Sequence, residues 1–275
     1  MTRPSKLTDL DGLVAHIVDG CLLAIPSDSS GVSMAATRAL IRRGVRNLHL
    51  VVVPTGGLPA DLLIGAGCVA TLEGAAVSLG EQGLAPRFRE AVERGAIDMR
   101  DATCPAVHAG LIAAEKGVPF LPVRGILGSD VLCHRPDWRV VDNPFAESGD
   151  PLVLVPAIRP DVALFHAPMA DTSGNIWIGI RRELMTMAHA ARITLATVET
   201  IVDCDLLSDE KMAPGTIAHV YVTGCAKAER GASPLGLAGY YSADSAHLAD
   251  YAEQARTADG FGRYLADHGM RRAAA

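Results

Sequence analysis

Aromatic residues are scarce in this sequence: Phe, Tyr and Trp make up 4% of its 275 residues, although 49% are hydrophobic. The core must therefore be built mainly from Val, Leu, Ile and Ala, a composition that favours buried parallel strands covered by helices. No stretch without charges or helix breakers is long enough to span a membrane. The start, "MTRPSKLTDLDG", lacks the apolar core of a secretory signal, so we expect a cytoplasmic protein without membrane contact.

Clustered basic residues and clustered cysteines are also missing. The formal net charge is -6 with acids and bases interspersed, so we expect no nucleic-acid partner. The cysteines form no C-x-x-C pair, which indicates reduced thiols and no metal site. They are Cys21, Cys68, Cys104, Cys133, Cys204 and Cys225.

Helical periodicity alternates with short apolar runs in the first part of the chain. Residues 6–20 have helical spacing that stops at Gly20, and the strand-like "CLLAIP" follows. Ser33 is a suitable N-cap for a helix that stops at Gly44, and "NLHLVVV" is typical of a buried strand. Helix, strand, helix and strand with short connections predict an α/β protein with a parallel sheet.

The second part of the chain continues this pattern with interruptions. The strands "VALFHAP" and "IWIGI" flank a hairpin-like turn, and the tail carries two helices separated near Asp259 and Gly260. Residues 125–150 are rich in Gly, Pro, Asp and Asn, so we expect an excursion from the sheet. Since no repeat or linker is visible, we predict one domain over residues 1–275.

Gly65, Gly67 and Ala70 match the G-x-G-x-x-A pattern of a dinucleotide-binding turn. That turn needs a strand before it and a helix after it. Here "LPADLLI" precedes and fits a helical turn as well as a strand, while "CVATLEGAAVSLG" follows and is typical of a strand. We therefore interpret the glycines as a packing turn and expect no nicotinamide or flavin.

Three stretches, "DLLIGAGCV", "VSLGEQGLAPRFREAVERGAI" and "AAEKGVPFLPVRGILGSD", follow one another in this order, with support from "RPDVALFHAPMADTSGN" and "YYSADSAHLADYAEQARTADGFGRYL". Together they resemble the A subunits of the class I coenzyme A transferases. The similarity is greatest to the glutaconate CoA-transferase α-subunit group, which includes the α-subunit of a steroid-ring hydrolase that acts on CoA thioesters. The resemblance spans nearly the whole chain.

The resemblance implies an open, largely parallel sheet with helices on both faces, the CoA-transferase-like fold. It also implies a homologous B subunit, often in an A2B2 heterotetramer, with the active site at the A/B interface. A glutamate of the B chain would attack acyl-CoA and form a glutamyl-CoA intermediate, which divides one acyl transfer into easier steps. Coenzyme A would be a substrate, and no permanently bound cofactor or metal is implied.

The resemblance puts the main nucleophile on the partner chain and leaves two candidate acids here. Glu81 in "SLGEQG" and Asp101 in "MRDATC" would each need a raised pKa to act as a base near neutral pH, and each also fits a solvated loop acid. Ser78 fits a pocket residue or a strand-end serine bonded to its own backbone. The candidate substrate-binding residues are Ser27, Gly31, Ser78, Thr103 and Gly128.

Two stretches depart from the family pattern. "IPSDSSG" stands where the family has a small G-G-F turn, and residues 101–104 lack the family's aromatic residue. Both changes fall where family members shape the acyl pocket. Cys104 and His108 lie four residues apart on one predicted helix and could form a nucleophile pair, but no third orienting group is evident, so we interpret Cys104 as a structural thiol.

The expected function is that of the α-type subunit of a heteromeric enzyme that transfers coenzyme A between carboxylic acids. Its partners would be a B subunit, acyl-CoA and carboxylate substrates. One alternative is a CoA-thioester hydrolase or ring-cleaving enzyme subunit of the same fold. Another is a non-catalytic small-molecule-binding homologue, which the altered "IPSDSSG" loop motivates.

Overall fold

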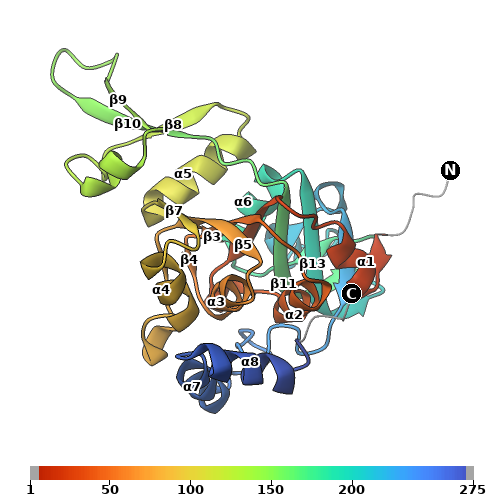
Figure 1. Cartoon of the computed structure of the whole chain (residues 1–275). Helices are drawn as coiled ribbons and strands as arrows, with labels where there is room; N and C mark the ends of the chain where they lie inside the picture. The colour runs from red at the N-terminus through yellow and green to blue at the C-terminus, as the bar shows by residue number, and fades with distance from the viewer. Residues whose placement is uncertain (1–5, 271–275) are drawn as a thin grey trace.

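A ten-stranded sheet runs through residues 6–270, the part of the chain described in the computed structural model (Figure 1). Its main strands lie in the order β1 (Leu7–Thr8), β15 (Gly224–Lys227), β13 (Ile193–Val202), β11 (Val162–Asp171), β2 (Leu22–Pro26), β3 (Leu48–Val53), β5 (Val69–Gly74) and β7 (Asp98–Asp101). Neighbours in this order are all parallel. Two short strands, β12 (Ile176–Trp177) and β14 (Thr216–Ile217), add antiparallel pairs beside β11. The prediction of an open, largely parallel sheet is confirmed.

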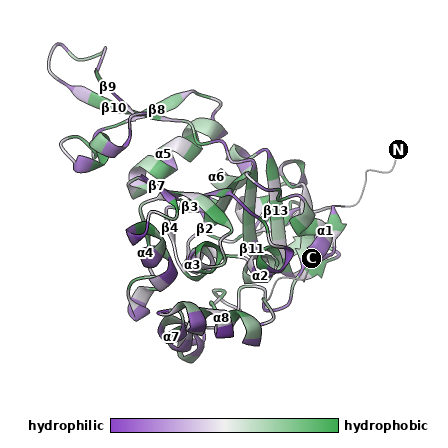
Figure 2. Cartoon of the chain, viewed as in Figure 1, coloured by the Kyte–Doolittle hydropathy of each residue, from purple (hydrophilic) through white to green (hydrophobic). Residues whose placement is uncertain are grey.

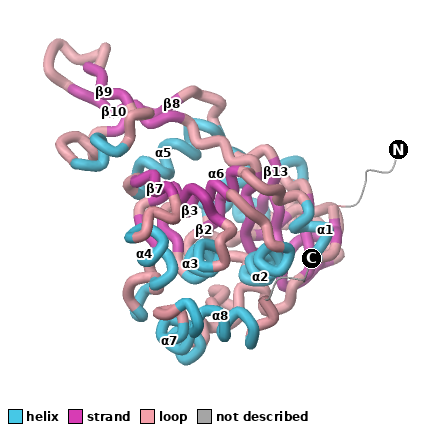
Figure 3. Tube along the Cα trace, viewed as in Figure 1, coloured by secondary structure: helices cyan, strands magenta, loops and turns pink. Residues whose placement is uncertain are grey.

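Helices cover both faces of the sheet because successive strand residues point to opposite sides. Leu23 and Ile25 of β2 lie in one hydrophobic cluster, and Ala24 between them lies in the other. The first cluster takes in side chains of α1 (Leu10–Ala15), α2 (Met34–Arg43), α3 (Leu58–Gly65), α4 (Pro86–Glu93), α7 (Ser245–Gln254) and α8 (Ala258–Asp267). The second takes in α5 (Cys104–Glu115) and α6 (Arg182–Ala190). Figure 3 shows the strands between these helices, and Figure 2 shows that α4 and α7 carry much hydrophilic surface.

The glycines of the dinucleotide-like stretch pack helices together. Gly65 ends α3, and a Cβ there would lie 2.6 Å from the Phe261 ring of α8. Gly67 has φ +67°, a left-handed conformation that favours glycine at a helix end. Helix α3 precedes these glycines and β5 follows them, so the packing interpretation is confirmed.

Asp61 is a fully buried carboxylate of α3 that joins three helices. Its Oδ1 accepts from the Phe88 N–H at 2.6 Å, and its Oδ2 accepts from the Tyr251 hydroxyl at 2.6 Å. Burial raises the pKa of Asp61 to about 6, against the hydrogen bonds that favour its ionised form. Asp61 thereby ties α3 to α4 and α7.

A second sheet projects from the main body as an arm of residues 120–156 (Figure 1). Its antiparallel strands lie in the order β8 (Phe120–Val123), β10 (Pro151–Pro156) and β9 (Arg139–Asp142), and the short 3-10 helix η3 (Asp130–His134) lies between β8 and β9. Residues 125–150 therefore leave the main sheet, as their composition predicts.

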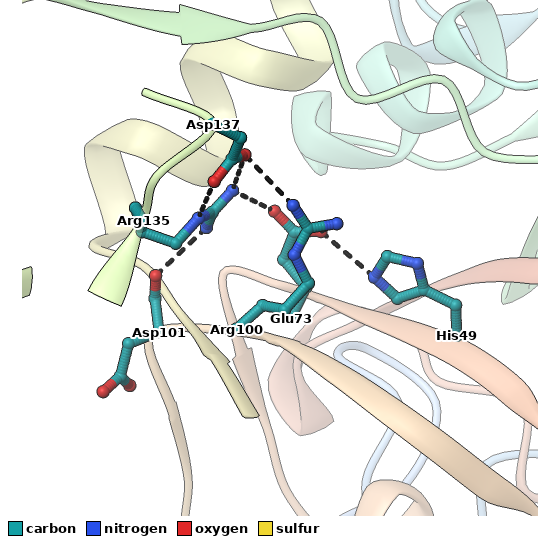
Figure 4. A network of polar contacts seen from close by, with 6 residues as sticks. All are labelled: His49, Glu73, Arg100, Asp101, Arg135 and Asp137. Atoms are coloured by element: carbon teal, nitrogen blue, oxygen red, sulfur yellow. Dashed lines mark hydrogen bonds and ion pairs between the residues drawn. The ribbon is translucent and has the colours of Figure 1, made fainter. Parts of the chain in front are cut away.

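Arg135 fastens the arm to the main sheet (Figure 4). Its guanidinium donates to Glu73 of β5 at 2.8 Å, to Asp137 at 2.9 Å and to the carbonyl oxygen of Asp101 at 3.0 Å. Burial opposes ionisation of Glu73, but a hydrogen bond with His49 and the Arg135 charge hold its pKa below the usual range. The network is a buried structural latch.

Two predicted helix boundaries are wrong. The first helix covers only Leu10–Ala15, since Asp9 caps it by accepting from the Gly12 N–H at 2.7 Å, and Leu7 pairs with Cys225 in the sheet. In the tail, the hydroxyl of Thr257 accepts from the Gly260 N–H at 3.0 Å. Asp259 and Gly260 therefore lie in the first turn of α8, and the break precedes them.

Three further pairs of elements complete the description of residues 6–270. Strands β4 (Thr55–Gly56) and β6 (Ala76–Val77) form a small parallel sheet. The 3-10 helices η1 (Asp28–Ser30) and η2 (Gly80–Gln82) follow β2 and β6, and η4 (Ala213–Gly215) and η5 (His219–Tyr221) flank β14. Within these residues, no helix is long and apolar enough to cross a membrane.

Candidate functional site

The sheet has a point where the order of its strands reverses, between β2 and β11. From β2 the chain adds β3, β5 and β7 on one side, and from β11 it adds β13 and β15 on the other. Strands β2 and β11 pair only at residues 23–24 and 162–163. Beyond them the loop of residues 27–31 enters the gap, and the Gly31 carbonyl accepts from the His166 N–H at 2.6 Å. In open parallel sheets, ligands bind at this reversal point, outside the carboxyl ends of the strands.

Three cavities meet this loop, and together we call them the crevice. The first, of about 670 Å³, is lined by Asp28, Ser29, Arg181 and residues 235–243. The second, of about 190 Å³, is lined by residues 29–31, His166, Pro168, residues 177–181, Leu184, Leu237 and Ala238. The third, of about 560 Å³, is lined by residues 27–29, Thr55, Gly56, Ala76, residues 78–82, Leu235, Ala243, Ser245 and Leu248. Ser29 lines all three, so they adjoin one another.

Glu199 of β13 lies beside the crevice and accepts four hydrogen bonds. The donors are the Tyr241 hydroxyl at 2.6 Å, His166 Nε2 at 2.8 Å and the backbone N–H groups of Arg230 at 2.7 Å and Gly231 at 3.2 Å. Tyr241 lines the first cavity and His166 lines the second. One buried carboxylate therefore holds both walls of the crevice against the ends of the strands.

The hydrogen bonds define where the protons lie. An ionised Glu199 only accepts, so Nε2 of His166 carries the ring proton. Nδ1 then accepts from the hydroxyl of Thr197 at 2.8 Å, and that hydroxyl accepts from Ser33 at 2.7 Å. Ser33, Thr197, His166, Glu199 and Tyr241 thus form one connected set, which we call the Glu199 cluster.

The pKa values follow from burial and from these bonds. Burial lowers the pKa of His166 despite the attraction of Glu199, which favours a neutral imidazole. Burial opposes ionisation of Glu199, but donation by Tyr241, Arg230 and His166 outweighs it and holds the pKa of Glu199 below its usual range. Since both oxygens of Glu199 are occupied, this carboxylate positions its neighbours rather than attacking a substrate.

Asp28 anchors the loop of residues 27–31 at the N-terminus of α3. Its Oδ2 accepts from the Leu58 N–H at 3.0 Å. Its Oδ1 is buried and has no hydrogen-bond partner among the described residues. Burial raises the pKa of Asp28 to about 6. A side chain at Gly57 would clash with this carboxylate, so glycine there allows the anchor.

Four of the predicted site residues border the crevice. Ser27, Ser78 and Glu81 line the third cavity together, and Gly31 lines the second. The Ser78 hydroxyl donates to the Gly83 carbonyl at 3.3 Å and accepts from the Gly80 N–H at 3.2 Å, so it closes its own loop as well. Glu81 is exposed. The roles assigned to these residues stay predictions.

The other three do not border any of the three cavities. Asp101 ends β7, and its carboxylate points away from the Arg135 network (Figure 4). Thr103 caps α5, where its hydroxyl accepts from the Ala106 N–H at 3.4 Å. Gly128 has φ +77° in the arm, with open space around it. The chain alone therefore gathers only part of the predicted set.

Glu199, Tyr241 and Arg181 were missed by the sequence reasoning. The only local signal for Glu199 is a carboxylate within the apolar strand "ITLATVETIV". Arg181 directly precedes α6, and its position beside the crevice depends on the hairpin β11–β12. Among residues 6–270, no group of three or more His, Cys, Asp and Glu side chains is arranged to hold a metal ion.

Comparison with known sequences gives one family. The coenzyme A transferase profile matches residues 8–222. The A subunit of 3-oxoadipate CoA-transferase from Pseudomonas knackmussii is 34% identical over 204 residues, covering 72% of this chain and 70% of the relative. The cholesterol ring-cleaving hydrolase IpdA subunit of Rhodococcus jostii is 30% identical over 280 residues, covering 98% and 93%. The A subunit of glutaconate CoA-transferase from Acidaminococcus fermentans is 30% identical over 248 residues, covering 82% and 75%.

Comparison with solved structures agrees. Glutaconate coenzyme A-transferase from Acidaminococcus fermentans superposes with a TM-score of 0.89 at 26% identity, covering 96% of this chain and 88% of that one. A variant of the decarboxylase AibA/AibB superposes with a TM-score of 0.83 at 32% identity, covering 94% and 98%. The fold is thus shared by proteins named for more than one reaction.

Proposed function

Because this chain belongs to the coenzyme A transferase family, we propose that it is the α-type subunit of a heteromeric enzyme that transfers coenzyme A between carboxylic acids. The observation that carries the proposal is the crevice at the reversal point of the sheet, bordered by the 27–31 loop and the Glu199 cluster. The similarity to relatives named as the A subunits of CoA-transferases supports it.

The proposed reaction proceeds through a glutamate of the partner subunit. Its carboxylate attacks the thioester carbonyl, and the thiolate of coenzyme A leaves to give an acyl-glutamyl anhydride. The thiolate then attacks the glutamyl carbonyl, which gives a glutamyl-CoA thioester and frees the first acid. An acceptor carboxylate repeats these steps in reverse and departs as acyl-CoA. Covalent catalysis of this kind replaces one difficult transfer by easier ones.

This chain would bind and orient the acyl part of the substrate. The Glu199 cluster fixes the walls of the crevice, and its saturated carboxylate leaves the nucleophilic role to the partner subunit. Ser27, Gly31, Ser78 and Glu81 are the proposed contacts on the loops that border the crevice. Coenzyme A enters as a substrate, and we propose no permanently bound cofactor.

Exposed apolar side chains near the crevice and on the arm support a partner subunit. Ile180, beside Arg181 in the lining of the crevice, is 90% exposed, and Phe145 on the arm is 96% exposed. Isolated apolar residues are common on surfaces, but large ones at a ligand site favour a protein contact. We propose a homologous B subunit in an A2B2 assembly that covers this side of the crevice.

A second candidate function is CoA-thioester hydrolysis or ring cleavage on the same scaffold. The observation that favours it is the near-complete coverage by the ring-cleaving hydrolase relative, 98% of this chain, against 72% by the 3-oxoadipate transferase relative. In thioester hydrolysis water, rather than a second carboxylate, would accept the acyl group, and coenzyme A would leave as the free thiol. The altered loop of residues 26–31 is the place where such a change of acceptor would act.

Co-expression with a homologous B subunit tests these proposals. Purified complex is mixed with acyl-CoA and a different carboxylic acid, and both new acyl-CoA and free coenzyme A are measured. New acyl-CoA, with inactivation by borohydride during turnover that requires the partner's glutamate, is the expected result. Free coenzyme A without new acyl-CoA supports the hydrolase. No complex and no acyl-CoA binding would leave only the non-catalytic homologue.

A further inference from the structure

The Asp28 carboxylate has one buried oxygen that no group of residues 6–270 satisfies. Its Oδ2 accepts from the Leu58 N–H at 3.0 Å at the start of α3, but its Oδ1 has no hydrogen-bond partner. Asp28 lines the first and third cavities of the crevice. Since a buried acceptor without a partner is unfavourable, such an oxygen on a residue at a cavity wall indicates a bond that a ligand completes.

The turn that carries Asp28 is held on both sides. The Ser27 N–H donates to the Val53 carbonyl at 3.2 Å, and the Ser30 N–H donates to the Ser27 carbonyl at 2.9 Å. Gly31 ends the turn with φ +86°, a left-handed conformation. The backbone therefore keeps the carboxylate in one place and leaves Oδ1 unsatisfied. The turn lies in "IPSDSSG", which departs from the family pattern, so this carboxylate is a feature of this chain.

The charged and titratable side chains that share the two cavities with Asp28 do not pair with it. They are Arg181, Tyr240 and Tyr241 in the first cavity and Glu81 in the third. Within the described residues, none of them forms an ion pair or hydrogen bond with Asp28. Burial raises the pKa of Asp28 to about 6, although the Leu58 N–H favours the ionised form. Because Oδ2 already accepts a bond, Oδ1 is the oxygen that takes up a proton.

The ligands of the proposed reaction offer this oxygen only acceptors. A free acid presents carboxylate oxygens, and a thioester presents a carbonyl oxygen. Neither can donate to an ionised Asp28, and two carboxylates side by side repel each other unless they share a proton. A neutral carboxyl group, in contrast, donates its O–H to either kind of oxygen.

We propose that Asp28 is a proton-carrying residue of the crevice, whose protonated Oδ1 donates a hydrogen bond to an oxygen of the bound acid or acyl group. Binding then takes one proton from solvent whenever Asp28 is ionised in the free protein, and that proton returns to solvent when the ligand leaves. No proton is transferred during the acyl exchange itself. This inference rests on the proposed function, because it assigns the crevice to the acyl part of acyl-CoA.

The other role for Asp28 is that of an anchor alone. An ionised carboxylate at a helix N-terminus is stabilised by the backbone N–H groups there. Such an anchor predicts that ligand binding is independent of the charge on Asp28 and takes up no proton. The two roles therefore differ in the pH dependence of binding.

Calorimetry with butyrate tests the proposal on the full chain in complex with its B subunit. We expect the affinity to fall about tenfold or more between about pH 6.5 and pH 8. At about pH 8, titrations in HEPES and in Tris, which differ in ionisation heat, should report roughly one proton taken up per butyrate. Asp28→Asn keeps a donor without a titrating proton, so its affinity should change less than about threefold over this range, with no proton taken up. Asp28→Ala lacks the donor and should bind butyrate about tenfold more weakly than wild type at pH 6.5.

Asp61→Asn is the matched control. Asp61 is a buried carboxylate of α3 whose pKa is also raised to about 6, and it lines none of the three cavities. Its hydrogen bonds run to α4 and α7 instead. The control variant should keep the proton uptake and the pH dependence of wild type.

Proton uptake that persists in Asp28→Asn would overturn the inference, because another group would then carry the proton. Affinity of wild type that does not change with pH, or loss of butyrate binding in Asp28→Asn at pH 6.5, would overturn it as well. So would a complex that binds neither acetate, butyrate nor hexanoate at pH 6.5. A complex that binds butyrate with the expected proton uptake but transfers coenzyme A to no acid would refute the proposed function and leave the role of Asp28 standing.

Discussion

Removing the hydroxyl of Tyr241 tests the Glu199 cluster most directly. Tyr241→Phe deletes the 2.6 Å hydrogen bond to Glu199 and also the acceptor of the Ala232 N–H at 3.1 Å. Hydrogen bonds to a charged group contribute about 1.5–3 kcal/mol, and a buried donor left unpaired costs a similar amount. The free energy of unfolding should therefore fall by about 2 kcal/mol or more. Tyr240→Phe is the matched control, since Tyr240 is its half-exposed neighbour in the same cavity wall.

Glu199→Gln completes a double-mutant cycle with Tyr241→Phe. The amide oxygen of Gln can still accept from Tyr241 and His166, but its nitrogen faces the Arg230 N–H, which now lacks an acceptor. We expect a loss of about 2–3 kcal/mol. In the Glu199→Gln variant the Tyr241 hydroxyl donates to a neutral oxygen, so this variant already loses the charge-assisted part of the bond, about 1 kcal/mol. The loss in the double variant should therefore be smaller than the sum of the two single losses by about that amount.

Urea unfolding followed by circular dichroism measures all four proteins. A coupling below about 0.5 kcal/mol would refute the reasoning, because the two groups would then stabilise the fold independently.

The pH dependence of the free energy of unfolding has a definite sign. Glu199 has a lowered pKa, so its contribution is present above its unfolded pKa and is lost as the pH falls. His166, also lowered, adds to the same acid loss, and the gap between wild type and Glu199→Gln should shrink toward about pH 4.

Three other perturbations follow from the described contacts. Arg135→Met leaves the buried Glu73 carboxylate without its main cation, so the free energy of unfolding should fall by about 3–5 kcal/mol. A second change, Glu73→Gln, removes the unpaired charge and should restore part of this loss. An unchanged urea midpoint in Arg135→Met would show that Arg135 does not hold the arm. Asp61→Asn removes a carboxylate whose pKa is raised to about 6 in the folded chain. As the pH rises from about 4 to 8, the free energy of unfolding of wild type should therefore fall by up to about 3 kcal/mol relative to this variant. A difference in melting temperature that does not change with pH would contradict this. Gly31 has φ +86°, and Gly31→Ala places a Cβ against the carbonyl oxygen of His166, so this variant should lose acyl-CoA binding or turnover. Gly80 has φ +61° but open space around it, so the control Gly80→Ala should show only mild strain. Equal effects of the two variants would argue against a fixed 27–31 loop.

The parallel sheet was predictable because its signal is local. In β2 and β3, largely apolar runs bounded by turn residues mark strands buried on both faces, and Gly44 marks the end of the helix between them. The tail was less predictable, since two signals compete there. Asp259 and Gly260 resemble a turn, but Thr257 caps α8 two residues earlier and the helix runs through them.

The candidate site divides in the same way between local and distant contacts. Ser27 directly follows β2, and Ser78 follows the short strand β6 that comes just after β5, so the order of the elements brings both residues near the carboxyl edge of the main sheet. Glu199 and Tyr241 are separated by 42 positions and meet only after β13, β15 and the segment that follows have packed. Nothing in either local stretch specifies the other, which is why Tyr241 was not foreseen.

The altered loop "IPSDSSG" argues for a changed ligand rather than a lost site. A loop without function relaxes toward well-satisfied polar groups, since an unpartnered buried oxygen is unfavourable. Here Asp28 keeps a buried Oδ1 without a partner among the described residues, at the wall of two cavities. Within residues 6–270, Arg181 remains unpaired across the first of these cavities, and Glu199 remains buried with four donors behind it. The unpartnered Asp28 oxygen and the unpaired Arg181 both oppose stability, and both lie at one crevice, which favours a binding site that the chain still uses.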